Sequence, residues 1–427
     1  MVQLPGPLSG RTRLAAGSAL LLAALVVAGP IGEAARLENH LSPVADPYSE
    51  SNAIRSALAI LEHGWTANAG LPESTFGGLY PETGHFRKYR GEIHVDTHYP
   101  PGPTWLTAAM KLGCGQRPVS CLRALPIAVS ALGAFVLAFA LMVSLGAPRG
   151  LAAAFGAFVV PLYSNMMLGL HYQGYALALL SIQLGALLTL FSSARALRAR
   201  DLVLVAGLAF LQGWLSFDYF FLVTLAPLPI AILFSDLRER APRRRLFALV
   251  LVGAAGFALA HALHFLQVVA YYGDFSAAAK DLLGAAGERS DPAGSPELRD
   301  KPPPSWAVDP WMMSSIFLFV LSARETHFGF RLGWTLLAAL AVLVVLRGVR
   351  LGVPGTGLRL SVDPSARPAW AIVAGVLVSC AWISMMPGHA HMHPHFIPRH
   401  LFLAWLVMVL ALLRSLRLEG WRPAASS

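Results

Sequence analysis

Charged residues are scarce in this chain of 427 residues. Asp, Glu, Lys and Arg together make up 13% of it, whereas soluble globular proteins carry about 25%. Hydrophobic residues reach 56%, and the mean hydropathy is +0.57. These charged residues are too few to cover the surface of a soluble protein of this length. A soluble nucleic-acid-binding protein, a coiled coil and a disordered chain are therefore excluded.

Familiar catalytic signatures are missing as well. The sequence contains no internal repeat, no Walker-type phosphate loop, no glycine fingerprint for dinucleotides and no nucleophile elbow. Any chemistry must therefore be sought among the polar residues that lie between the apolar segments.

Long apolar runs dominate the sequence instead. Because a membrane-spanning helix needs about 20 mostly apolar residues, the sequence predicts an all-α integral membrane protein with about ten transmembrane helices. The predicted spans are 14–32, 122–146, 150–167, 171–192, 202–217, 219–235, 246–271, 328–346, 368–386 and 400–416. The apolar segment 311–322 is too short to cross, and we predict that it is re-entrant or packs beneath an outer loop.

Two of these predicted spans allow more than one interpretation. Arg11 and Arg13 precede the first apolar run, which is typical of either a cleaved signal peptide or an uncleaved anchor, and the length of the run favours an anchor. The stretch 202–235 is too long for one helix that crosses a bilayer. We therefore predict a break around Asp218.

The positive charges predict the orientation. With the N-terminus inside, the inner segments hold 18 basic and 5 acidic residues, and the outer segments hold the remaining 15 basic and 18 acidic residues. Short cytoplasmic loops of membrane proteins are rich in Lys and Arg. Both termini are therefore predicted to be cytoplasmic, in a multi-pass protein of the plasma membrane or bacterial inner membrane. The net charge of +10 reflects this topology, and no nucleic-acid partner is expected.

The polar residues indicate that the extracytoplasmic face is the functional one. Two long segments, 33–121 and 272–327, are predicted outer loops of a single membrane domain. All 14 histidines lie in outer loops or near the outer ends of spans. Cys114 and Cys121 share the first loop, where an oxidising compartment permits a disulfide, and free thiols are the alternative. The Gly-, Pro- and Ser-rich segment 284–310 is predicted to be an irregular surface loop.

The first outer loop is predicted to contain an amphipathic helix. Apolar residues repeat at helical spacing from Ala53 to Leu61, and Gly64 is typical of a helix end. Such a helix is suited to the plane of the lipid headgroups. Asp46 and Glu50 stand near its start, where an acid either caps the helix or takes part in catalysis.

A second polar group precedes a double proline. His94, Asp96 and His98 alternate and would share one face of a strand, where they could hold a metal or exchange protons, and a solvated loop is the alternative. Pro100 and Pro101 then predict an extended entry into a helix that is too short to cross the membrane.

These features resemble the C-type glycosyltransferase superfamily, in particular its protein O-mannosyltransferase and lipid A aminoarabinose transferase branch. The resemblance covers the first outer loop firmly and the rest of the chain by topology. It is carried by the acid-plus-helix segment from Glu50 to Gly64 and by the double-proline segment with Pro100, Pro101, Trp105, Leu106 and Lys111. The superfamily usually has an Asp-Glu pair where this chain has Ser49-Glu50, and a Lys where it has Tyr99.

The resemblance implies transfer of a sugar, with inversion, from a polyprenyl-phosphate donor to a lipid, glycan or protein acceptor on the outer face. An outer carboxylate would accept the proton of the acceptor hydroxyl. The candidates are Asp46, then Glu50, then Asp96. A cationic group would neutralise the lipid phosphate as the bond breaks. Candidates for binding the donor phosphate or the substrate are His98, Tyr99, His171, Asp218, Arg324 and Arg399.

A histidine-rich string lies before the last span. His391, His393 and His395 alternate and are candidate ligands for a divalent metal ion such as Zn²⁺, although an interfacial loop near lipid phosphate is the interpretation we favour. No cofactor is certain from the sequence. Two other functions are alternatives: a multi-pass transporter, and an outer-face metal-binding membrane protein. Transporters favour charged residues in mid-span and paired broken helices, and neither is clear here.

Overall fold

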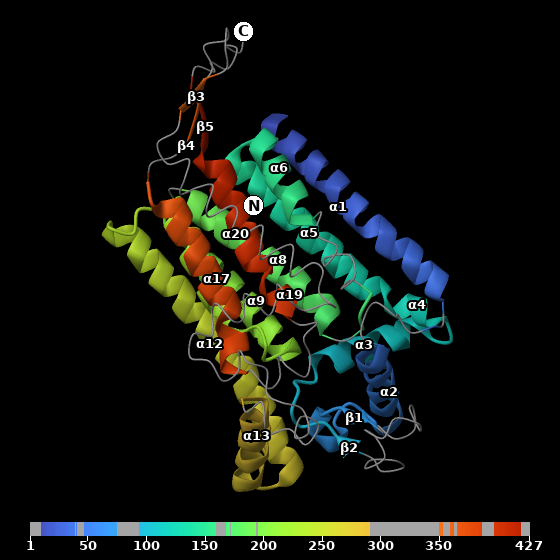
Figure 1. Ribbon diagram of the computed structural model, residues 1–427. Coiled ribbons are helices and arrows are strands. Elements are labelled where there is room, and N and C mark those ends of the chain that lie inside the picture. The colour runs from blue at the N-terminus through green and yellow to red at the C-terminus, as the bar shows by residue number, and fades with distance from the viewer. Residues whose placement is uncertain are drawn as a thin grey trace, which may run out of the picture.

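The computed structural model is a bundle of long helices with smaller elements gathered at its two ends (Figure 1). It describes residues 10–38, 40, 47–74, 94–158, 168–170, 172–193, 195–290, 350–352, 359–362, 365–386 and 397–419. Within these ranges, five helices are long and apolar enough to cross a membrane: Thr12–Leu37, Val119–Leu145, Gly174–Ser192, Arg240–Tyr272 and Arg367–Met385. Two shorter apolar helical segments are Phe220–Phe234 and Phe402–Ser415. The chain therefore has the helices of a multi-pass membrane protein.

The bundle consists of α1 (Gly10–Leu37), α5 (Ala124–Leu145), α6 (Ala147–Phe158), α8 (Gln173–Ser192), α9 (Ala199–Leu215), α10 (Phe220–Leu225), α11 (Pro227–Phe234), α12 (Arg240–Tyr272), α17 (Arg367–Met385) and α20 (Phe402–Ser415). Five predicted spans coincide with the long helices. The others are shorter helices or lie outside the described residues, as 328–346 and the segment 311–322 do, so the predicted number of ten is not confirmed. The predicted break around Asp218 is confirmed, because α9 ends at Leu215 and α10 begins at Phe220.

The core of the bundle surrounds α8. Leu180, Leu184 and Leu187 on this helix have no exposed surface, which is expected of a helix that is apolar all round. Large apolar side chains on the outer helices instead point away from the core, among them Leu25 of α1 and Phe247 of α12, which are 64% and 69% exposed. A soluble protein would bury side chains of this size, whereas lipid is a favourable environment for them.

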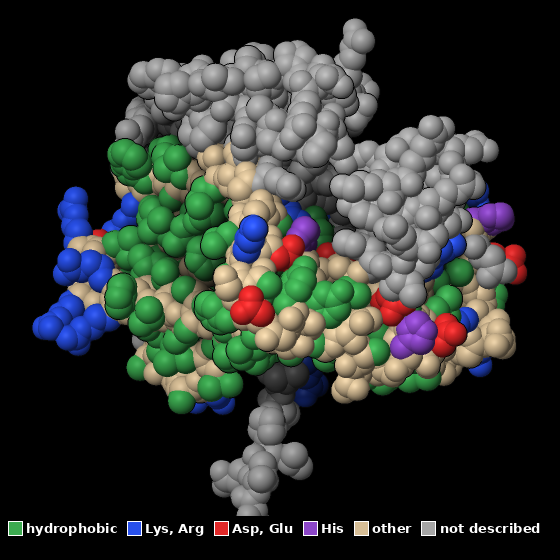
Figure 2. Space-filling view, turned by 90° about the horizontal axis from the view of Figure 1, so that it is seen from below, with side chains coloured by type: hydrophobic (Ala, Val, Ile, Leu, Met, Phe, Trp, Pro, Cys, Tyr) green, Lys and Arg blue, Asp and Glu red, His purple; other side chains and the backbone are tan. Residues whose placement is uncertain are grey.

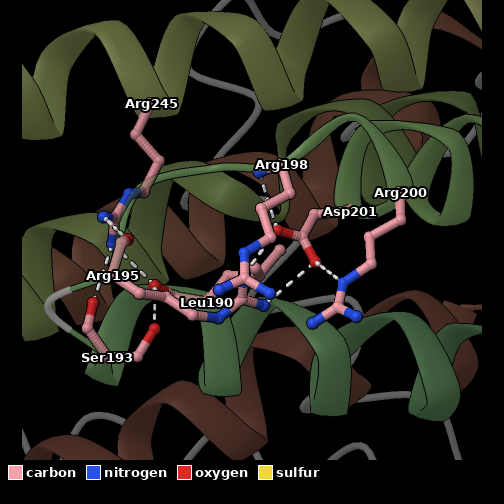
Figure 3. A network of polar contacts seen from close by, with 7 residues as sticks. All are labelled: Leu190, Ser193, Arg195, Arg198, Arg200, Asp201 and Arg245. Carbon is pink, nitrogen blue, oxygen red and sulfur yellow. Dashed lines mark hydrogen bonds and ion pairs between the residues drawn. The ribbon is translucent and has the colours of Figure 1, made fainter. Parts of the chain in front are cut away.

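One end of the bundle is held together by arginines, and we call it the arginine-rich end. Arg245 of α12 donates hydrogen bonds to the carbonyl oxygens of Leu190, in the last turn of α8, and of Ser193 and Arg195, just beyond it (Figure 3). Arg195 in turn binds both carboxylate oxygens of Asp201, at 2.6 and 2.9 Å. The hydrogen bond from Arg195 and that from the Arg198 backbone hold the pKa of Asp201 down at about 2. These contacts fix the connection between α8 and α9 against α12.

The same end carries a small antiparallel sheet that the sequence analysis did not predict. Its strands, in the order β3 (Arg350–Gly352), β4 (Arg359–Val362) and β5 (Leu416–Glu419), extend from the bundle beyond α20 (Figure 1). Arg359 lies opposite Glu419, and Leu360 lies opposite Leu418.

The opposite end, which we call the loop end, collects the smaller helices. These are α2 (Pro47–His63), η1 (Ala67–Gly70), α3 (Gly102–Cys114), α4 (Val119–Leu122), α13 (Phe275–Ser290) and α19 (Ile397–His400), together with the paired strands β1 (Glu73–Ser74) and β2 (His94–Val95). A disulfide between Cys114 and Cys121 joins α3 to α4, so of the two alternatives for these cysteines the structure has the disulfide. Asp, Glu and His side chains lie among apolar ones on this end (Figure 2).

Segments predicted to share one side of the membrane do lie at the same end of the molecule. The arginine-rich connections at 193–198 and 235–239 are at one end, and the described parts of the two long loops are at the other (Figure 1). Which end faces the cytoplasm stays a prediction based on charge. One prediction is wrong: the part of segment 284–310 that the structure describes, 284–290, is helical and ends α13.

Candidate functional site

The frame of the loop end is formed by α2 and α3. A helix is present over Ala53–Leu61, as predicted: in α2, Ala57 and Ile60 pack against Ala108 of α3, whereas Leu58 is 44% exposed. The chain leaves α2 at Gly64, whose φ of +99° suits glycine. The two helices together form a platform on which the polar residues of the first loop are placed.

Glu50 is part of this frame. Its Oε1 lies 3.0 Å from the guanidinium of Arg123, and both side chains are almost completely buried, at 1% and 0% exposed. Arg123 also donates a hydrogen bond of 2.7 Å to the carbonyl oxygen of His40, just after α1. The pair therefore joins the end of α1, the first turn of α2 and the start of α5. In this structure, the carboxylate of Glu50 is bound to an arginine and closed off from solvent.

The double proline places α3 against the bundle. α3 begins at Gly102, directly after Pro101 as predicted, and the backbone of Trp214 in α9 occupies the space that a Cβ at Gly102 would need. Trp105 donates a hydrogen bond of 2.8 Å from Nε1 to the carbonyl oxygen of Gly70 and meets Trp214 edge to face. This close approach brings the residues before the prolines to the C-terminal end of α9.

The alternating group His94, Asp96 and His98 does not share one strand face. Strand β2 ends at Val95, and Asp96 accepts a hydrogen bond of 3.0 Å from the backbone N–H of His98 in a local turn. The ring of His98 lies 3.2 Å from Asp281 of α13, and this carboxylate also accepts a hydrogen bond from Thr97. Asp281 therefore binds the second loop to the first, a role that the sequence analysis did not identify.

The turn between α9 and α10 carries a buried acid. Asp218 is 1% exposed and accepts a hydrogen bond of 2.7 Å from the hydroxyl of Tyr172, at the start of α8. Its backbone N–H donates to the hydroxyl of Ser216. Burial raises the pKa of Asp218 to about 6, although the hydrogen bond from Tyr172 and the positive charges of Arg289 and Arg399 act to lower it. Asp218 is thus a buried carboxylate within the field of two guanidiniums.

Arg289 reaches this turn from α13. Its guanidinium carbon lies 5.1 Å from the centre of the Tyr99 ring and 5.0 Å from that of Phe217. Tyr99 also lies face to face with Tyr172, at 6.5 Å between ring centres. Arg289 lies in a segment whose Gly, Pro and Ser content predicts an irregular loop, so its place at this turn is not evident from the sequence. The helical spacing of Ala278, Leu282 and Ala285 is the signal that would have identified α13.

Arg399 reaches the same turn from α19. It lies on α19 and is 1% exposed, and its charge acts on both Asp218 and Tyr219. The neighbouring His400 fixes α19, since its ring is stacked between Trp382, at 4.6 Å, and Tyr219, at 5.1 Å. Arg289 therefore meets the turn at Phe217 and Arg399 meets it at Tyr219, the two residues that flank Asp218 in the sequence.

The predicted site residues divide into three groups. Tyr99, Asp218 and Arg399 are brought together at this turn, and His98 and Asp96 lie beside them on the first loop. Glu50 is held apart by Arg123. The remaining candidates, Asp46, His171, Arg324, His391, His393 and His395, lie outside the described residues. Among the residues that the structure describes, no three His, Cys, Asp or Glu side chains are arranged to hold a metal ion.

Comparison with known proteins adds a structural likeness. No protein-family model and no curated protein sequence match this chain. Among solved structures, the chain is similar to that of ArnT from Cupriavidus metallidurans, which was crystallised with undecaprenyl phosphate. The likeness has a TM-score of 0.44 and 14% identity, and covers 96% of this chain and 77% of the other.

The chemistry of the site follows from its charges. Two guanidiniums lie around one buried carboxylate and next to the rings of Tyr99, Tyr172, Phe217 and Tyr219. Guanidinium groups bind phosphate through parallel hydrogen bonds. Aromatic rings around them exclude water, which strengthens the attraction between the charges. The arrangement is suited to holding a phosphate that is attached to an apolar group.

Proposed function

We propose that this protein is a membrane glycosyltransferase of the C-type kind, which moves a sugar from a polyprenyl-phosphate donor to an acceptor at the loop end. The observation that carries the proposal is the convergence of Arg289 and Arg399 on the turn 217–219, where the first loop packs against the ends of the spans. A phosphate there would be close to the lipid-facing helices, and its isoprenoid chain could remain in the bilayer. The loop end then faces the extracytoplasmic side.

The two guanidiniums stabilise the negative charge of the leaving group. As the bond between the sugar and the phosphate breaks, the leaving group gains negative charge, and fixed positive groups stabilise that charge most in the transition state. Arg399 is positioned by its neighbour His400, whose ring is stacked on Trp382. Arg289 is positioned by the rings of Tyr99 and Phe217. Neither group needs to reorganise when the donor binds.

The general base is proposed to be Asp46, with Asp96 as the second candidate. Asp46 directly precedes Pro47 in the sequence, and α2 begins at Pro47. Asp96 is partly exposed and its charge acts on Arg289, so it lies near the phosphate-binding groups. Glu50 is assigned a positioning role, because a carboxylate bound to a buried arginine is a poor proton acceptor.

The proposal is tested by measuring sugar transfer from a radiolabelled polyprenyl-phosphate sugar in purified membranes. The variant Asp46→Asn is expected to lower the rate of transfer by about 10²–10⁴-fold, the usual contribution of a general base. Binding of the donor should change little, because the phosphate-binding arginines are intact. The matched control is Asp274→Asn, which removes an acid that caps the first turn of α13 and lies away from the turn 217–219. Full activity of Asp46→Asn would contradict the assignment of the base.

A further inference from the structure

The carboxylate of Asp218 is the feature of the site that phosphate binding alone does not explain. A negative charge beside an anion-binding site weakens binding, and yet this one is buried at its centre. Its neighbours in the chain, Phe217 and Tyr219, are the rings next to which Arg289 and Arg399 lie. The structure therefore places one negative charge within the field of two positive ones.

The net charge of the site follows from the groups that face Asp218. They are Tyr172 from α8, Ser216 in the same turn, Arg289 from α13 and Arg399 from α19, with Tyr99 below Arg289 and His400 beside Arg399. Of these, the two arginines are positive and Asp218 is negative, so the buried site carries a charge of +1. Asp96 acts on Arg289 from the first loop, but it is partly exposed and therefore more strongly screened.

This charge distinguishes the substrate of the proposed reaction from its product. A polyprenyl-phosphate sugar is a phosphodiester with a single negative charge. After transfer, the lipid phosphate is a monoester, whose second ionisation has a pKa of about 6 and gives it a charge of about −1.5 to −2 at neutral pH. A site with a charge of +1 matches the donor, and a site with a charge of +2 would match the product.

We propose that Asp218 is a specificity-determining residue, which makes the site hold the singly charged phosphodiester donor in preference to the doubly charged phosphomonoester product. This inference rests on the proposed function and deepens it. Once the sugar has left, the second negative charge of the lipid phosphate faces the carboxylate of Asp218, and repulsion between them favours release of the product. The arginines can then bind a new donor.

The raised pKa of Asp218 provides a second measurable consequence. As the pH falls through about 6, Asp218 takes up a proton and the charge of the site rises from +1 to +2. A diester probe, whose own charge is constant over this range, is then expected to bind more tightly at pH 5 than at pH 7.5. Removal of the carboxylate should abolish this dependence.

The test compares the binding of two probes to the purified full-length protein in nanodiscs. Farnesyl phosphate represents the product, and methyl farnesyl phosphate represents the diester of the donor. At pH 7.5 the wild-type protein is expected to bind the diester more tightly. In Asp218→Asn the monoester should gain about tenfold to a hundredfold in affinity, because one repelling charge within a few ångströms has been removed. Asp218→Glu keeps the charge and should keep the preference for the diester.

The results of this test distinguish failure of the inference from failure of the proposed function. Reversal of the preference in Asp218→Asn, together with loss of the pH dependence of diester binding, supports the inference. An unchanged preference in a folded Asp218→Asn protein overturns it and leaves the proposed function in place, provided that the wild-type protein binds both probes. If the wild-type protein binds neither probe, the proposed function and the inference fail together. Thermal unfolding of each variant shows whether it is folded.

Discussion

Replacement of Arg399 by methionine is expected to lower kcat/KM for the lipid-linked sugar donor by about 10³-fold. The guanidinium is buried next to Asp218 and Tyr219, and the loss of a fixed group that stabilises developing charge costs about 10²–10³-fold in kcat alone. Weaker binding of the donor phosphate should add to this loss. The measurement is the steady-state kinetics of sugar transfer in nanodiscs.

Arg414 provides a matched control for this variant. It also lies over an aromatic ring, that of Phe234, at 4.5 Å, but it is near the end of α20, towards the arginine-rich end of the bundle. Arg414→Met should retain kcat/KM to within about twofold, since this residue is remote from the charge that develops in the reaction. Equal losses in the two variants would mean that Arg399 acts only through the packing of the bundle.

Replacement of Glu50 by glutamine is expected to lower the free energy of unfolding by about 3–5 kcal/mol. Its partner Arg123 has no exposed surface, and removing one member of a buried ion pair leaves an uncompensated charge in a medium of low dielectric constant. The measurement is thermal or denaturant unfolding in detergent. The double variant Glu50→Gln with Arg123→Met should recover much of the loss, because no unpaired charge is then left in the core.

The exposed pair on α1 is the natural comparison. Glu33 binds Arg36 at 2.6 Å, but the arginine side chain is 68% exposed, so Glu33→Gln should leave the melting temperature unchanged.

If Glu50 were instead the general base, Glu50→Gln would abolish transfer while the melting temperature stayed the same. This result would contradict the positioning role assigned to it.

Local sequence patterns predicted the elements whose formation depends on neighbouring residues. The run from Ala53 to Leu61 and the following Gly64 predicted α2, and the double proline predicted the start of α3 at Gly102. Likewise, an apolar stretch too long for one span predicted the break at Asp218. In each case the physical cause, whether helical periodicity, the fixed φ of proline or the thickness of a bilayer, acts within about 20 residues.

The site itself was only partly predictable, because its members come together through tertiary contacts. In the sequence, Arg289 comes 72 positions after Phe217, and Arg399 comes 182 positions after Phe217. No local pattern shows that both arginines would meet the same turn. Arg399 was identified from its place at the mouth of a span. Arg289 was missed because glycines in its segment masked a helix. The ion pair of Glu50 could not be predicted either, because its partner Arg123 lies in a distant segment.

The central claim is that Arg289 and Arg399 together bind a lipid phosphate. The most direct measurement is an experimental structure of the protein with a bound polyprenyl phosphate. We expect the phosphate oxygens to lie within about 3 Å of both guanidiniums, with the isoprenoid chain running between the helices into the bilayer. A phosphate bound away from the turn 217–219, with both arginines unchanged in their contacts, would contradict the account.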